Sequence, residues 1–171
     1  MTLTIESFLE LDQRGLRSAH DAGYPIDPAA LDDSRYRGVS LGLPHVVDRL
    51  LWKTFEKTFH RDASGTLRGW NVRVEQTGLR GPLEPRIRKG QPWTFGHYVV
   101  EDRGDHLELD YHQGANPRLD PTRLARDPLV AVNEGDAEWL LGAIDVVLPG
   151  ARMRTPSYFL LVREGPLEHV V

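Results

Sequence analysis

The sequence WTFGHYVVEDRGDHLELDYH, residues 93–112, decides the fold. Apolar and polar residues alternate in it on both sides of the turn DRGD, and a period of two is typical of β-strands. Two such strands joined by a short turn that contains glycine form an antiparallel hairpin. We therefore predict strands near 93–102 and 105–113, in a fold built mainly on antiparallel sheet.

The same alternation recurs along much of the chain. It predicts further strands near 35–41, 66–76, 128–133, 138–147 and 157–164. The turn NEGD separates two of them, as DRGD does in the central hairpin. The seven predicted strands are compatible with a closed barrel, an open curved sheet or a sheet wrapped on a long helix, and alternation alone does not decide between these architectures.

Helical patterns are confined to the first third of the chain. Ser7 and Glu10 have the spacing of a capping box and predict a first helix that ends near Gly23. The segment HVVDRLLWKTFEKTFH predicts a second helix over 45–60, because Leu51, Phe55 and Phe59 recur at a spacing of four. We expect one domain over 1–171, with a helical segment over 1–33 and a barrel over 34–165 that includes the second helix.

Composition narrows the classes of function. The formal charge of −4 argues against a dedicated nucleic-acid-binding domain. The chain has no cysteine, which excludes disulfides, thiol nucleophiles and zinc–cysteine sites. Its apolar runs are too short for a membrane span, and its acidic start does not resemble a signal peptide, so we expect a cytoplasmic protein. The oligomeric state stays open.

A short motif suggests a family. Residues 34–38, Ser-Arg-Tyr-Arg-Gly, resemble the G-x-W-x-G signature of small bacterial proteins of unknown function, with Ser34 in place of the first glycine and Tyr36 in place of tryptophan. The order of the other segments is also similar to that family. A helical segment precedes the motif, the aromatic-rich LLWKTFEKTF follows it, and EWLLGAID and PSYFLL come late in the chain.

The resemblance implies a calycin-like barrel, of the lipocalin or fatty-acid-binding-protein type, whose interior holds a small apolar ligand. It implies no reaction. A related class of barrels binds haem through a histidine near the C-terminus, but the last predicted strand here has no histidine and His169 lies beyond it. Haem is therefore not expected, and the cofactor stays unknown, with none predicted.

Alternation also selects candidate site residues. On the strand over 93–99 the apolar face contains Trp93 and His97, and on the next strand it ends in Tyr111. The later strands place Asp145 and Tyr158 on faces that are otherwise apolar. If these faces meet in one interior, the five residues line a mostly apolar cavity. A histidine paired with a carboxylate there has the character of a general acid or base.

Other polar groups have simpler interpretations. Asp48 falls in the first turn of the predicted second helix, where the helix dipole favours a negative charge. His106, Glu108, Asp110 and His112 share one face of a strand, a spacing compatible with a metal but expected of a solvated face, and we predict no metal site. The basic, Pro- and Gly-rich loop over 79–92 is expected near an entrance to the barrel.

The sequence thus supports one leading hypothesis and two alternatives. The leading hypothesis is the binding of a small, largely apolar molecule inside a barrel of which the predicted helices close one end. The first alternative is an acid/base isomerase, dehydratase or cyclase that uses His97 with Asp145 or a tyrosine in the same cavity. The second is a protein-interaction module that uses the uneven charge distribution, with no particular residue behind it.

Overall fold

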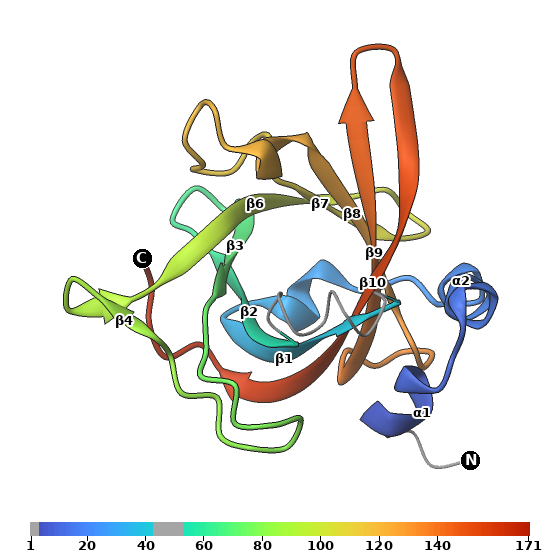
Figure 1. The fold of residues 1–171 in the computed structure, drawn as a ribbon. Coiled ribbons are helices and arrows are strands. Elements are labelled where there is room, and N and C mark those ends of the chain that lie inside the picture. Colours follow the sequence, from blue (N-terminus) through green and yellow to red (C-terminus); the bar gives the residue numbers. More distant parts are fainter. Residues whose placement is uncertain (1–3, 43–52) are drawn as a thin grey trace.

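Eight antiparallel strands close into a barrel in the computed structural model, which describes residues 4–42 and 53–171 (Figure 1). The strand order around the barrel is β1-β10-β9-β8-β7-β6-β3-β2. These strands are β1 Ser34–Leu41, β2 Thr54–Arg61, β3 Leu67–Val72, β6 Thr94–Asp102, β7 Leu107–Asp110, β8 Ala125–Ala131, β9 Trp139–Leu148 and β10 Ala151–Pro166. The predicted fold class, mainly β with a calycin-like antiparallel barrel and N-terminal helices, is confirmed.

The first and last strands close the barrel. Val39 of β1 lies opposite Leu160 of β10 on one side and Thr54 of β2 on the other. Two inward glycines make room for aromatic rings at this seam. A Cβ on Gly38 would come within 2.3 Å of the Phe55 ring, and one on Gly142 within 2.1 Å of the Phe159 ring. Glycine at these two positions therefore leaves the space that the two rings occupy.

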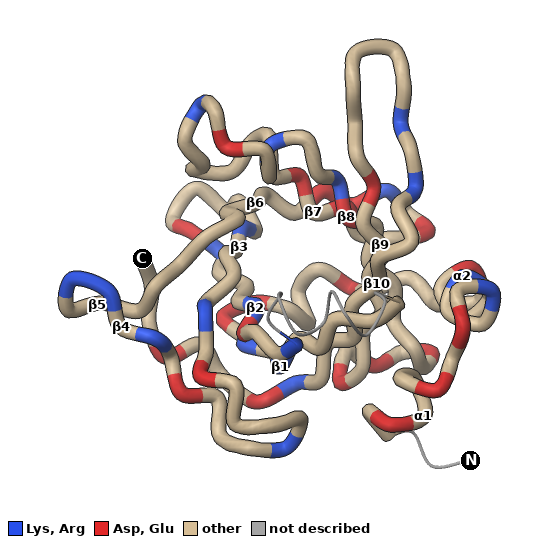
Figure 2. Tube along the Cα trace, in the orientation of Figure 1, with Lys and Arg blue, Asp and Glu red and all other residues tan. Residues whose placement is uncertain are grey.

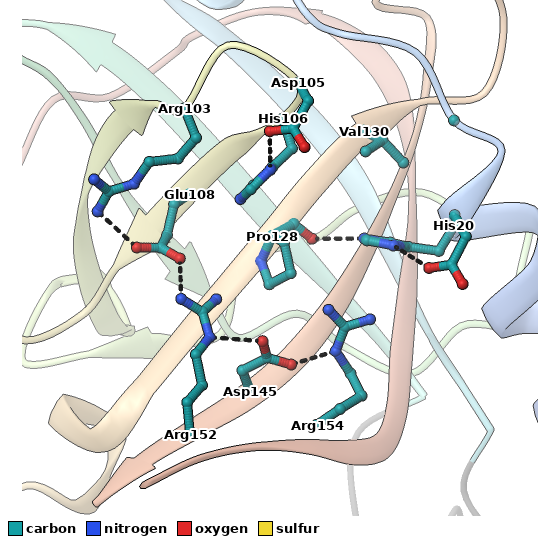
Figure 3. A pocket seen from close by; sticks show the side chains of 12 residues that line it. His20, Arg103, Asp105, His106, Glu108, Pro128, Val130, Asp145, Arg152 and Arg154 are labelled. Carbon is teal, nitrogen blue, oxygen red and sulfur yellow. Dashed lines mark hydrogen bonds and ion pairs between the residues drawn. The ribbon is translucent and has the colours of Figure 1, made fainter. Parts of the chain in front are cut away.

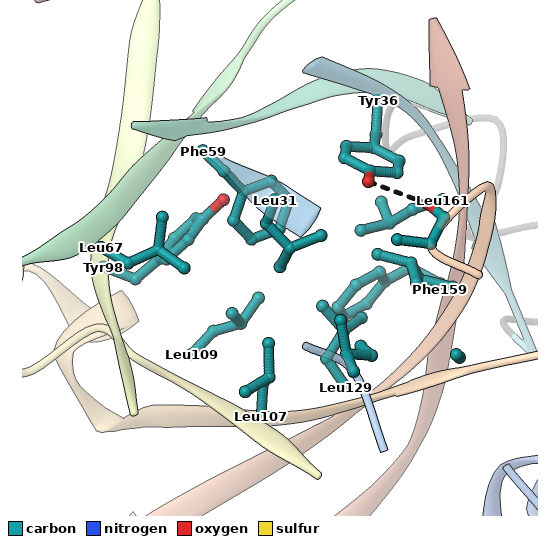
Figure 4. Close-up of a cluster of buried hydrophobic side chains, with 14 of the residues drawn as sticks. Leu31, Tyr36, Phe59, Leu67, Tyr98, Leu107, Leu109, Leu129, Phe159 and Leu161 are labelled. Atoms are coloured by element: carbon teal, nitrogen blue, oxygen red, sulfur yellow. Dashed lines mark hydrogen bonds between the residues drawn. The ribbon is translucent and has the colours of Figure 1, made fainter. Parts of the chain in front are cut away.

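One part of the barrel interior is filled by large apolar side chains (Figure 4). Tyr36, Phe59 and Tyr98 pack edge-on with ring centroids 5.5 and 5.8 Å apart. The short 3₁₀ helix η1, Pro28–Leu31, contributes the fully buried Leu31 to this cluster. The other members of the cluster include Leu67, Leu107, Leu109, Leu129, Leu140 and Leu161. This packed region holds the barrel together and forms one boundary of the interior.

The two N-terminal α-helices lie outside the barrel (Figure 1). Helices α1, Ile5–Leu9, and α2, Gln13–Asp21, are separate because Asp12 caps the second one, accepting a hydrogen bond from the Gly15 amide at 2.7 Å. Their apolar residues cover the outer faces of β1, β9 and β10, in a second cluster with Val39, Leu141, Ala143 and Leu160. Helices α1 and α2 therefore do not close an end of the barrel, contrary to what was predicted of the helices.

The predicted helix over 45–60 is also wrong where the structure describes it, because residues 54–61 form strand β2. Residues 45–52, with Asp48 and Leu51, lie outside the described residues. The spacing of Phe55 and Phe59 fits a strand as well as a helix, since both residues point to the same side in either structure. Between them Lys57, a charged residue on the inner face, concealed the period of two.

The remaining elements are short. The segment over 79–92 ends in a small hairpin of β4, Ile87–Arg88, and β5, Gln91–Pro92, where basic residues gather away from the barrel axis (Figure 2). The 3₁₀ helix η2, Pro121–Leu124, leads into β8. The hairpin between β9 and β10 projects beyond the other strands (Figure 1). No helix among the described residues is long and apolar enough to span a membrane.

Candidate functional site

A cavity of about 390 Å³ occupies the part of the barrel interior that the leucine-rich cluster leaves open. This volume is within the range of small-molecule sites, roughly 300–1,000 Å³. Its wall is largely apolar, with a few polar groups on the innermost side. The described residues that line it are Ser40, Phe55, Lys57, Asn71, Phe95, Gly96, Tyr111, Thr122, Ala125, Asp127, Ile144, Ser157, Tyr158 and Phe159.

Three polar side chains form a hydrogen-bonded chain at this cavity. The Lys57 Nζ atom donates to the Tyr111 Oη atom at 2.9 Å, and Tyr111 donates in turn to Asp127 Oδ2 at 2.8 Å. Lys57 is 1% exposed and Asp127 3% exposed. Alternation places them there, because Lys57 has the parity of Phe55 and Phe59 on β2, and Asp127 that of Leu129 on β8. The sheet therefore directs a cation and an anion into the same interior.

Aromatic rings surround the ammonium group of Lys57. The Nζ atom lies 4.5 Å from the ring centroid of Tyr98, 5.0 Å from Phe159, 5.4 Å from Tyr111 and 5.9 Å from Phe55. These distances are in the range of cation–π attraction, which is stronger when the cation is removed from water. The rings replace part of the hydration that Lys57 loses.

Burial brings both ionisable groups towards neutral pH. Loss of water lowers the pKa of Lys57 to about 8, although the charge of Asp127 opposes this shift. Loss of water also raises the pKa of Asp127 to about 7, against the attraction of Lys57 and the hydrogen bond from Tyr111. Burial and the nearby Asp127 charge raise the pKa of Tyr111 well above its ordinary value, so the phenol keeps its proton and bridges the two groups. Such values are common at functional sites.

One oxygen of this chain is unsatisfied. Asp127 Oδ1 is buried and has no hydrogen-bond partner in the described part of the chain. The nearby Asn71 side chain is directed to the wall, since its Nδ2 atom donates to the Gly96 carbonyl oxygen at 2.9 Å. A buried acceptor without a donor is unfavourable by about 1–3 kcal/mol. Asp127 is one of the residues that line the cavity, so a rotation of its carboxylate would bring this acceptor to a bound molecule that carries a donor.

Two of the five predicted site residues border this cavity. Tyr111 provides the bridging hydroxyl group described above. Tyr158 lies at the cavity wall, but its ring belongs to the outer cluster and meets the His20 ring edge-on at 6.2 Å. A register shift between Arg154 and Tyr158 precedes it on β10. The structure thus brings the two tyrosines to the cavity wall.

His97 and Trp93 do not line the cavity, so the prediction that His97 faces the interior is wrong. Tyr98 and Gly96 take the inward positions of β6, and the His97 ring lies against Trp70 at a centroid distance of 6.2 Å. Burial lowers the pKa of His97. Gly96, with φ of +52°, allows Phe95 to reach the cavity as well. The alternation on this strand was therefore assigned to the wrong face beyond Phe95.

Trp93 lies outside the barrel with the basic segment. The Arg73 and Arg88 guanidinium carbons are 3.9 and 4.9 Å from its ring centroid. None of the residues over 79–92 is among the described residues that line the cavity, so the expected place of this segment near the entrance is not observed. Cation–π contacts explain the position of Trp93 without a ligand.

Asp145 lies on the outer face of the barrel, in a wide charged groove of about 610 Å³ (Figure 3). Its carboxylate accepts a hydrogen bond from Arg152 Nε at 2.8 Å and pairs with Arg154. Asp145 therefore does not share a cavity with His97, and the proposed His97–Asp145 acid/base pair is wrong. The apolar face of β9 that contains Asp145 is the one covered by the N-terminal helices, not the interior one.

The charges of the groove neutralise one another. Glu108 accepts hydrogen bonds from Arg152 at 2.6 Å and from Arg103 at 2.8 Å. Partial burial opposes ionisation of Glu108, but these two arginines outweigh it and lower the pKa of the carboxyl. The histidine His20 is buried beside the groove, and burial lowers its pKa. Ion pairing explains this arrangement of side chains without a bound molecule.

The acidic face of β7 is not solvated as expected. Glu108 is 4% exposed and Asp110 is 6% exposed, and Asp110 pairs with Arg126 at 3.1 Å. Arginine side chains cover the face, because long guanidinium groups reach carboxylates on neighbouring strands. Within the described ranges, no group of three or more His, Asp or Glu residues could hold a metal ion.

The sequence interpretation missed Lys57 and Asp127. Lys57 falls in the segment predicted as a helix, and the structure shows strand β2 over Thr54–Arg61 there. Asp127 immediately precedes Pro128, where the predicted strand began, although β8 begins at Ala125. Alternation of Asp127 with Leu129 and Ala131 was the available signal, and it would have placed the carboxylate on the inner face.

Comparisons with known proteins add no functional assignment. The chain matches no model of a protein family, and no curated protein is significantly similar to it in sequence. The resemblance of residues 34–38 to the G-x-W-x-G signature stays a prediction. In the structure Tyr36 of this motif is fully buried and donates a hydrogen bond to the Ala137 carbonyl oxygen at 2.9 Å.

Proposed function

We propose that the barrel binds a small, largely apolar molecule in its interior cavity. The observation that carries this proposal is a 390 Å³ space beside a packed core, lined by Phe55, Phe95, Ile144 and Phe159. Folded proteins normally fill their interiors to crystal-like density, so a space of this size needs a reason. The apolar wall provides the affinity, and the Lys57–Tyr111–Asp127 chain provides a polar end that orients the ligand.

The polar chain supports a ligand site better than a purely structural role. A buried ion pair contributes little to stability compared with apolar residues of the same shape, and here one carboxylate oxygen is also unsatisfied. In the leucine-rich half of the same interior the strands carry apolar side chains at equivalent positions. The polar residues occur where the open space is, which is the arrangement expected of a binding site.

A direct probe titration of the wild type and of a cavity-filling variant tests the proposal. The uncharged fluorescent probe N-phenyl-1-naphthylamine is titrated into the wild-type protein and into Ala125→Phe, which places a ring in the cavity. We expect saturable binding by the wild type and at least tenfold weaker binding by the variant, because the space is occupied.

The matched control is Leu119→Phe, which adds the same ring at a position that is 94% exposed. It should bind the probe as the wild type does. Circular dichroism and thermal unfolding establish that both variants are folded. Equal probe binding by Ala125→Phe and the wild type would show that the probe binds elsewhere and would contradict the proposal.

A further inference from the structure

We propose that the ligand of the interior cavity is uncharged and that its polar end donates a hydrogen bond to Asp127, as a long-chain alcohol or primary amide does, whereas the matching carboxylate is rejected. This inference rests on the proposed binding function and adds the chemical class of the ligand. It is carried by three features of the cavity: the compensated charge of Lys57, its aromatic surroundings, and the unsatisfied oxygen of Asp127.

The positive charge of Lys57 is already balanced inside the barrel. Asp127 is linked to Lys57 through a single hydroxyl group, with hydrogen bonds of 2.9 and 2.8 Å. Between the pKa of Asp127, about 7, and that of Lys57, about 8, the pair is neutral overall. An entering carboxylate would add an unbalanced negative charge where water is excluded, which is strongly unfavourable.

Among the described residues, the surroundings of the pair supply no further unpaired cation. Asp127 is the charged group that acts on Lys57, and Lys57, Asp145 and Arg152 are those that act on Asp127. Asp145 and Arg152 are paired with each other in the outer groove. The four aromatic rings around Lys57 Nζ further reduce the space in which an anion could approach it.

The unsatisfied Asp127 Oδ1 atom determines which neutral groups fit. An ionised carboxylate only accepts hydrogen bonds, so it selects a ligand group with a proton to donate. A hydroxyl or amide group has such a proton, whereas an ether or an ester does not. The apolar rings of Phe55, Phe95 and Phe159 then receive the hydrocarbon part of the ligand.

Three compounds with the same chain test this selectivity in the wild-type protein. They are 1-decanol, decanoate and decyl methyl ether, and each competes with N-phenyl-1-naphthylamine at about pH 7.5, between the pKa values of Asp127 and Lys57. We expect 1-decanol to bind about tenfold or more tightly than the other two, because only it is both uncharged and a donor. Equal or tighter binding of decanoate would overturn the charge argument. Equal binding of the ether would overturn the assignment of Asp127 as the acceptor.

A variant reverses the expected preference. Asp127→Asn removes the negative charge, so the carboxylate of decanoate can take its place beside Lys57 and keep the amine protonated. Decanoate should then bind more tightly than 1-decanol. Asp145→Asn is the matched control, because it removes a buried carboxylate on the outer side of the wall and should keep the preference for the alcohol. An unchanged preference in Asp127→Asn, or a reversal in Asp145→Asn, would contradict the inference.

The two proposals fail in different ways. If neither the fluorescent probe nor any of the three compounds binds the folded wild-type protein, the binding function itself is wrong, and the ligand class is wrong with it. If the probe binds and Ala125→Phe abolishes its binding, but decanoate is preferred, only the ligand class is wrong.

Discussion

The interior cavity and the outer groove differ in how completely their buried carboxylates are paired. In the groove, Asp145 and Glu108 each accept hydrogen bonds or ion pairs from two arginines. In the cavity, Asp127 accepts one hydrogen bond from Tyr111 and has an oxygen without a partner among the described residues. The larger hollow is thus electrostatically complete, and the smaller one is not. Incomplete pairing, more than volume, distinguishes the candidate site.

The largest effect is expected from breaking the interior pair. Lys57→Met should lower the free energy of unfolding by on the order of 3 kcal/mol, because it leaves a buried carboxylate without its cation. Adding Asp127→Leu should restore most of this loss, since an apolar pair replaces an ionic one. Urea unfolding of the two single variants and the double variant measures the coupling. Losses that simply add would show that the two residues do not act as a pair.

The pH dependence of stability should show the same pair. Asp127, with its pKa raised to about 7, stabilises the fold less as pH rises from about 4 to 7. Lys57, with its pKa lowered to about 8, stabilises the fold more as pH rises from about 8 to 10. We compare the free energy of unfolding of the wild type with that of the double variant Lys57→Met/Asp127→Leu. The wild-type value minus the variant value should be smallest between pH 7 and 8.

Relative to that minimum, we expect the wild type to gain about 1–2 kcal/mol at pH 5.5 and again at pH 9.5. Urea unfolding of both proteins at each pH measures the difference, and the subtraction removes titrations outside the pair. A flat difference across this range would mean that neither group titrates near neutrality.

Removing a charge from the outer groove should lower the free energy of unfolding less than removing one from the cavity. Asp145→Asn should cost about 1 kcal/mol, because the side chains of Arg152 and Arg154 are 42% and 26% exposed and regain water when the carboxylate is removed. Salt at 0.5 M should reduce this cost, since it screens exposed ion pairs more than buried ones. A loss of stability as large as that of Lys57→Met would show that the charges of the groove are shielded from water as strongly as those of the cavity.

The smallest effect is expected at His97. His97→Ala should change stability by less than about 1 kcal/mol and leave probe binding unchanged, because the ring contacts Trp70 and Thr94 and does not line the cavity. Thermal unfolding measures the change in stability, and the probe titration measures binding. Weakened probe binding would show that His97 contributes to the binding site.

Alternation predicted most of the barrel but only part of the site. It placed the seven predicted strands near observed ones and directed Leu107, Leu109 and Tyr111 inward. It failed on β9 because the outer face, covered by α1 and α2, is also apolar. When both faces of a strand are buried, parity alone does not identify the inner one. It failed on β2 because Lys57, a charged residue of the candidate site, points inward and interrupts the alternation that would have predicted a strand.

The central claim is that ligands enter the barrel interior and not the outer groove, and a titration followed by side-chain NMR tests it most directly. With selectively labelled aromatic residues and histidines, addition of 1-decanol should shift the signals of Phe55, Tyr111 and Phe159, which border the cavity. The signals of His20 and His106, which border the groove, should stay in place. Shifts confined to His20 and His106, with the signals of Phe55, Tyr111 and Phe159 unchanged, would contradict the account.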